Sequence, residues 1–160
     1  MNIMKGIILV IVACLTSLGA LASDSTPFFQ IRLVLDAPAK GAEQMVYRNE
    51  VLYVQKTVLL DETALVSATV VPADTRDRND RLHIEIVFTD KGKKRLATVT
   101  RQNIGKSFAF IVRGKVYFVP RIMVEISSDK IPIHGTFTEM EANDLAAQIN
   151  EMIKEASTKR

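Results

Sequence analysis

Short stretches of alternating apolar and polar residues run through the first half of the chain and predict strands. Residues 28–35 place large apolar side chains on one face, at Phe29, Ile31, Leu33 and Leu35. Residues 51–58 are rich in β-branched and aromatic side chains and predict a second strand. Between these stretches, residues 36–44 contain Pro38 and Gly41, which predict a loop.

Residues 59–71 give two competing predictions. Asp61 and Glu62 would suit the first turn of a helix, whereas Val70 and Val71 favour a strand. The charged residues 72–80 predict a turn. Residues 82–88 then alternate again, which predicts a half-buried strand.

A helix is predicted from Thr89, a suitable N-cap residue, to about Asn103. Its inner face carries Leu96, Val99 and Thr100. Gly105 follows, where the end of a helix often needs a left-handed residue.

A hairpin is predicted beyond this helix. Residues 108–112 are apolar on both faces, as in a central strand, and a tight turn at Arg113-Gly114 leads into residues 116–119. Pro120 is expected to end the pairing because proline has no N–H to donate. Residues 122–126 and 131–133 are two further candidates for short strands.

The last helix is the clearest element of the pattern. Thr138 and Glu141 form a T-x-x-E capping box, in which each residue's side chain satisfies the other's backbone N–H. An apolar stripe at helical spacing follows and predicts a core-facing side, made of Ala142, Leu145, Ala146, Ile149, Met152, Ile153 and Ala156.

These elements predict an α+β fold, with an antiparallel or mixed sheet and two main helices packed on one face. The predicted organisation is a signal peptide at residues 1–22, a linker and first strand at 23–50, the α+β domain at 51–156 and a polar tail at 157–160.

The first 22 residues predict export from the cytoplasm. Lys5 precedes an apolar run at residues 7–13, and Ala20-Leu21-Ala22 suits signal peptidase, with cleavage before Ser23. Two alternatives stay open. The first is an uncleaved membrane anchor, although a membrane span needs about 20 apolar residues. The second is lipidation of Cys14, because residues 11–14 resemble a lipobox. The predicted location is periplasmic or extracellular.

Composition narrows the chemistry. Cys14 is the only cysteine, so a chain cleaved after residue 22 would have no disulfide, thiol nucleophile or thiolate metal site. The net charge of +3 is too small to favour a nucleic-acid partner.

Candidates for catalysis and metal binding are weak. His83 and His134 are far apart in sequence and lack a common metal-ligand spacing. The turn also carries a cluster of side chains with oxygen atoms that could bind calcium, but their spacing does not match a calcium loop; they are Asp74, Asp77, Asn79 and Asp80. We therefore predict no enzymatic activity, no metal and no cofactor.

Motifs in the second half resemble a known family. They are FTDKG at 88–92, LATVT at 96–100, NIGK at 103–106, AFIVRGKV at 109–116, VPRI at 119–122 and IHGTFTEMEANDLA at 133–146. Together they resemble the periplasmic head subdomain of SecD and SecDF, strongly over residues 87–149 and weakly over 52–71. The motif positions for which we predict structural roles are Gly92, Asn103, Gly105, Gly114, Pro120, Gly135, Thr138 and Glu141.

The resemblance implies a surface that engages polypeptide during protein export, or that docks on the Sec translocase or another envelope partner. Ser127-Ser128 replace the family's Gly-Gly, and the run that leads into the family's membrane helices is missing. We therefore expect a stand-alone exported binding domain without proton coupling of its own. The alternatives are an accessory structural envelope protein with no client and a small-ligand-binding domain.

One cluster of charge also has a functional interpretation. The first predicted helix and its C-terminal turn carry six basic residues, which could contact anionic lipid or an acidic partner: Lys91, Lys93, Lys94, Arg95, Arg101 and Lys106. A solvated helix face is the alternative.

The leader gives the first testable prediction. Mass spectrometry of the exported protein should find Ser23 as the first residue, because the small residues before it suit signal peptidase. A mature chain that begins with lipid-modified Cys14 would contradict it.

Overall fold

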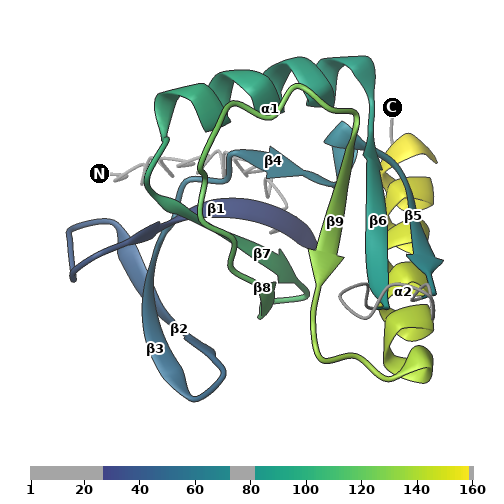
Figure 1. Ribbon diagram of the computed structural model, residues 1–160, viewed down its shortest axis with the longest axis horizontal. Coiled ribbons are helices and arrows are strands. Elements are labelled where there is room, and N and C mark those ends of the chain that lie inside the picture. The colour runs from purple at the N-terminus through teal and green to yellow at the C-terminus, as the bar shows by residue number, and fades with distance from the viewer. Residues whose placement is uncertain (1–26, 73–81, 159–160) are drawn as a thin grey trace, which may run out of the picture.

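The computed structural model describes residues 27–72 and 82–158, and its strands divide into two antiparallel sheets accompanied by two helices (Figure 1). The α+β class and the antiparallel pairing are confirmed, but two sheets replace the single sheet that the sequence predicted. The predicted signal peptide and the cluster from Asp74 to Asp80 lie outside the described residues.

The larger sheet has the strand order β2-β3-β1-β7-β8, and β4 pairs with β1. Its strands are β1 (Phe29–Leu35), β2 (Ala42–Tyr47), β3 (Glu50–Gln55), β4 (Leu60–Asp61), β7 (Ser107–Val112) and β8 (Lys115–Phe118). Although β2 and β8 stand at opposite ends of this order, they contact each other, so the sheet curls.

The smaller sheet has the order β5-β6-β9, with β5 (Leu65–Val71), β6 (His83–Phe88) and β9 (Lys130–His134). The predicted alternation over residues 82–88 is confirmed, because Ile84, Ile86 and Phe88 are buried while the residues between them are half-buried. Strand β9 confirms the strand that was predicted at residues 131–133.

Helix α1 (Asp90–Gln102) begins at the predicted cap, where the N–H of Gly92 donates to the hydroxyl of Thr89 at 3.0 Å. A Cβ at Gly92 would lie 2.2 Å from the carbonyl oxygen of Ala64, the last residue of the 3-10 helix η1 (Glu62–Ala64). Glycine is therefore required where α1 begins, because its backbone packs directly against η1.

Helix α2 (Glu139–Thr158) packs along β5 and β6 (Figure 1). The predicted capping box is present: the N–H of Thr138 donates to Glu141 Oε2 at 2.8 Å, and the N–H of Glu141 donates to Thr138 Oγ1 at 3.2 Å. Asn150 fixes α2 to the sheet, because its side-chain amide donates to the carbonyl of Ala68 at 2.8 Å and accepts from the Ala68 N–H at 2.9 Å.

Two apolar clusters fill the fold. The main cluster joins both sheets and both helices, and its largest fully buried side chains include Phe29, Phe108, Phe110, Ile84, Leu96 and Ile149. A smaller cluster lies on the opposite face of the larger sheet, made of Val54, Ala109, Ile111 and Val116.

A buried arginine stands on that opposite face. Arg32 of β1 is only 5% exposed, and its guanidinium donates to the carbonyl of Gln55 at 2.6 Å and to Glu43 Oε2 at 3.0 Å. Gln55 belongs to β3 and Glu43 to β2, so the curled part of the sheet supplies the hydrogen-bond partners that the buried charge of Arg32 needs.

Several predicted elements need correction. Residues 42–44, expected in a loop, begin β2, whose hairpin turn has positive φ at Arg48 and Asn49, as a two-residue hairpin turn requires. Within its described part, segment 23–50 therefore contains β1, β2 and the first residue of β3. Residues 59–71 form β4, η1 and β5 in succession. Residues 122–126 form no strand.

The predicted hairpin at Arg113-Gly114 is confirmed, but pairing does not end at Pro120. The N–H of Phe108 donates to the carbonyl of Pro120 at 3.0 Å, and Ser107 bridges Arg121. Proline lacks only the backbone N–H donor, and its carbonyl oxygen still accepts a hydrogen bond.

The docking of α2 gives a stability prediction. Leu145 is 2% exposed in the main cluster, so Leu145→Ala should lower the free energy of unfolding by about 2–4 kcal/mol. Met140 on the same helix is 72% exposed, so Met140→Ala should change it by less than about 0.5 kcal/mol. Urea denaturation measures both, and equal effects would mean that α2 is not docked as described.

Candidate functional site

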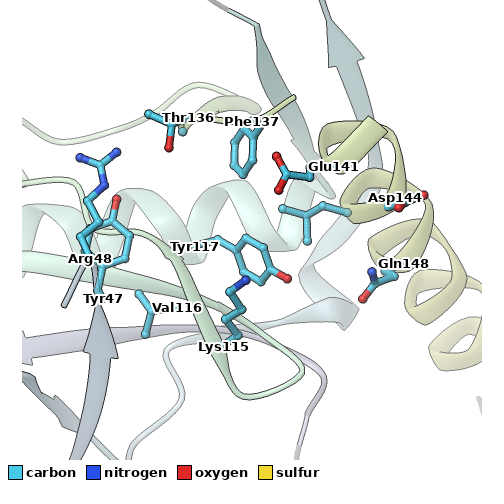
Figure 2. A pocket seen from close by; sticks show the side chains of 12 residues that line it. Tyr47, Arg48, Lys115, Val116, Tyr117, Thr136, Phe137, Glu141, Asp144 and Gln148 are labelled. Carbon is cyan, nitrogen blue, oxygen red and sulfur yellow. The ribbon is translucent and has the colours of Figure 1, made fainter. Parts of the chain in front are cut away.

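A groove of about 470 Å³ lies where the two sheets and α2 approach one another. Four segments form its walls: the end of β2 with its turn, strand β8, residues 135–137 after β9, and the first turns of α2 (Figure 2). The lining residues are Tyr47, Arg48, Lys115, Val116, Tyr117, Gly135, Thr136, Phe137, Glu141, Asp144, Leu145 and Gln148.

Three aromatic rings from three separate segments line this groove, which we call the aromatic groove. Figure 2 shows Tyr47 on the β2 side and the rings of Tyr117 and Phe137 directed into the space between β8 and α2. Each ring is half-buried, so part of its apolar surface stays open to a ligand. Aromatic rings provide large contact area at low conformational entropy cost, which suits a binding surface.

Gly135 determines where the Phe137 ring lies. A Cβ at Gly135 would meet the ring of Phe137 at 2.5 Å, so the ring folds back over the glycine. The family-like spacing Gly135-x-Phe137 therefore builds one wall of the groove, a role that the sequence alone did not assign.

The backbone edge of β8 also reaches the groove. Arg113 and Gly114 have φ of 48° and 78°, the geometry of a two-residue hairpin turn, and Val112 pairs with Lys115. In such a hairpin the pair next to the turn exchanges hydrogen bonds, so the N–H and C=O of the next residue, Val116, point away from β7. Because β8 ends the strand order and Val116 lines the groove, these two groups lie on an edge with which no described strand pairs, although β2 approaches it and Val116 itself is only 4% exposed.

The charges of the groove are divided between its sides. Arg48 and Lys115 stand over the rings of Tyr47 and Tyr117, at 5.2 Å and 4.9 Å from the ring centres. Glu141 and Asp144 stand on the α2 side (Figure 2). A bound chain would thus lie between a basic and an acidic rim.

Hydrogen bonds from the backbone N–H and the hydroxyl of Thr138 lower the pKa of Glu141 below its ordinary value of 4.5, and the charge of Lys115 acts in the same direction. The carboxylate is therefore ionised at neutral pH while it caps α2.

The predicted motif residues divide between groove and scaffold. Gly135 and Glu141 line the aromatic groove, and Thr138 orients Glu141. Asn103 caps α1, where its amide donates to the carbonyl of Val99 at 2.8 Å, and Gly105 has a φ of 88°. Gly92, Gly114 and Pro120 also serve the scaffold.

The six basic residues at α1 form a different surface. Most of them are exposed, and none lines the aromatic groove. Among the described ion pairs only Arg101 of the six takes part, with Glu125 at 3.7 Å. The structure therefore separates this surface from the groove.

The structure brings together two residues that the sequence treated as unrelated. His83 of β6 and His134 of β9 are directly opposite partners, with ring centres 5.2 Å apart. Finding this pair from the sequence would have required the register of β6 against β9. No group of three or more potential metal-ligating residues occurs within residues 27–72 and 82–158.

Residues 39–151 match the family model described as SecDF, P1 head subdomain. Since this match covers more than half of the sequence, the chain belongs to that family. In the described part of the chain, neither helix is long and apolar enough to cross a membrane.

Curated relatives are protein translocase subunits. The chain is 38% identical over 77 residues to SecDF of Thermus thermophilus, covering 46% of this chain and 10% of that protein. It is 33% identical over 125 residues to SecD of Endomicrobium trichonymphae, covering 78% and 25%. The chain therefore spans a quarter or less of the length of these relatives.

Solved structures share the fold. A SecDF structure, described as that of a membrane component that enhances protein export, superposes with a TM-score of 0.59 at 25% identity and covers 76% of this chain and 60% of that chain. The super-membrane-facing form of SecDF gives a TM-score of 0.62 at 24% identity, over 76% and 18%.

The capping box gives a prediction for pH. A carboxyl group whose folded pKa is lowered stabilises the fold above its unfolded pKa, and this stabilisation is lost as the pH falls through the folded pKa. Glu141→Gln should therefore lower stability at neutral pH, and the gap to wild type should close below about pH 4. Denaturation curves across this range test it, and a gap that is constant with pH would contradict it.

Proposed function

We propose that this domain holds extended polypeptide segments in the aromatic groove during protein export. The observation that supports this proposal most is that the groove places the unpaired edge of β8, at Val116, beside the rings of Tyr47, Tyr117 and Phe137. An unfolded chain offers both matching features along its whole length: backbone hydrogen-bonding groups and intermittent apolar side chains.

Binding would add the peptide as a further strand beside β8. The N–H and C=O of Val116 would pair with the peptide backbone, while alternate peptide side chains would enter the aromatic groove. Recognition through the backbone tolerates many sequences, as a protein-export component requires. The groove is small, so we expect affinities in the micromolar range or weaker.

Family membership supports the export context. The relatives are translocase subunits, and we propose that this domain likewise works outside the cytoplasm, near the Sec translocase or another envelope partner. The part of the relatives that this chain matches is the head subdomain, so we assign it a binding role, without catalysis and without proton coupling of its own.

A binding experiment with matched variants tests the proposal. Unfolded, fluorescently labelled peptides are titrated into the purified protein, followed by anisotropy. Tyr117→Ala should weaken binding by about tenfold, because buried aromatic anchors dominate small interfaces. Tyr53→Ala is the control, since Tyr53 on β3 is also half-buried but lies outside the groove.

Two further measurements distinguish backbone pairing in the aromatic groove from charged contact with α1. A peptide with N-methylated backbone amides should bind more weakly, because it cannot pair fully with β8. Moderate salt should have little effect. If salt abolishes binding and Lys94→Glu does the same, the peptide binds to the basic surface of α1. If Tyr117→Ala and Tyr53→Ala weaken binding equally, the aromatic groove is not the binding site.

A further inference from the structure

A pair of imidazole rings stands on the outward face of the smaller sheet. His83 on β6 is half-buried, and His134 at the end of β9 is exposed. Their ring centres lie 5.2 Å apart with 48° between the ring planes. The buried residues Ile84 and Ile133 beside them point to the opposite face, into the core.

The register of the two strands explains this closeness. The N–H of Phe88 donates to the carbonyl of Asp129 at 2.8 Å, so hydrogen-bonded pairs recur at every second position from there. His83 and His134 therefore form a non-hydrogen-bonded pair, as do Glu85 and Pro132, where proline has no N–H to donate. In such pairs the Cα atoms are about 4.5 Å apart and the side chains are at their closest.

The ring separation matches the geometry of metal coordination. Two imidazoles bound to one tetrahedral ion, with metal–nitrogen distances of about 2.0–2.1 Å, hold their ring centres roughly 5 Å apart. Each histidine needs to give the ion only one of its two nitrogens, and the other nitrogen is free to keep a hydrogen bond to the protein.

We propose that His83 and His134 form a two-histidine binding site for a divalent transition metal of the Zn²⁺ or Ni²⁺ type, with water in the remaining positions. Imidazole suits these ions, whereas Mg²⁺ and Ca²⁺ prefer oxygen ligands. This site does not depend on the proposed function of the aromatic groove.

Neighbouring residues restrict the orientation of the histidine pair and limit the metal affinity of the site. The ring of Phe118 packs against His134 edge-on, with ring centres 6.2 Å apart, and restricts the orientation of His134. Glu85, on the same face of β6, is engaged by Lys130 at 2.8 Å. With two protein ligands the affinity should be micromolar or weaker, below that of structural zinc sites with four.

Metal binding would link β6 to β9 at the end of the smaller sheet. His134 immediately precedes Gly135, where the wall of the aromatic groove begins. An ion that binds only the folded pair also stabilises the folded state. The site would therefore fasten the strand from which this wall extends.

The test uses protein purified without a histidine tag, because the chain itself has only two histidines. Ni²⁺ and Zn²⁺ are titrated by calorimetry, and thermal unfolding is followed with and without each ion. We expect one site and a higher Tm, with no effect of Mg²⁺. Either His83→Gln or His134→Gln should lower the affinity at least about tenfold and remove the shift in Tm.

Unchanged Ni²⁺ affinity in both variants would overturn the proposal, as would no binding to the wild type at about millimolar ion. A second measurement needs no variant, which guards against a substitution that unfolds the chain. Diamagnetic Zn²⁺ should shift the NMR signal of one ring nitrogen in each of the two imidazoles, because each ring gives one nitrogen to the ion. A shift in one ring alone, or in neither, would also overturn it.

Discussion

Pairing between β1 and β7 is the interaction on which the other elements depend. Six residue pairs, from Phe29 opposite Val112 to Val34 opposite Ser107, place these two strands in the middle of the larger sheet. One face contributes Phe29 and Phe110 to the main core, where the smaller sheet and both helices pack. The other face is covered by the curl of β2 and β3, so both faces of the pair are removed from water.

The aromatic groove lies where the two sheets end. The larger sheet stops at β8 and the smaller sheet at β9, and these two end strands belong to different sheets. Phe118 and His134 meet between them, while Val116 and Phe137 line the space beyond. A site beside an unpaired strand edge thus arises at the junction of two sheets, and this is where we propose that polypeptide binds.

The sequence predicted most elements that carry a strong local signal. The capping box at Thr138 and Glu141, the cap at Thr89 and the turn at Arg113-Gly114 depend on neighbours within four residues, and each was found. Strand β2 was missed because most residues of its hairpin are half-buried, without a clear alternation of buried and exposed positions, and because the turn residue Asn49 was not recognised. The division into two sheets, the groove and the histidine pair depend on contacts between distant segments, which periodicity cannot reveal.

The central claim is that extended polypeptide pairs with the edge of β8. Hydrogen exchange of the backbone amides, followed by NMR with and without an unfolded peptide, tests it most directly. The hairpin register turns the N–H of Val116 away from β7, so pairing with the peptide should slow its exchange, together with signal changes at Gly135 and Phe137. Unchanged exchange at Val116, with peptide-induced changes confined to α1, would contradict the account.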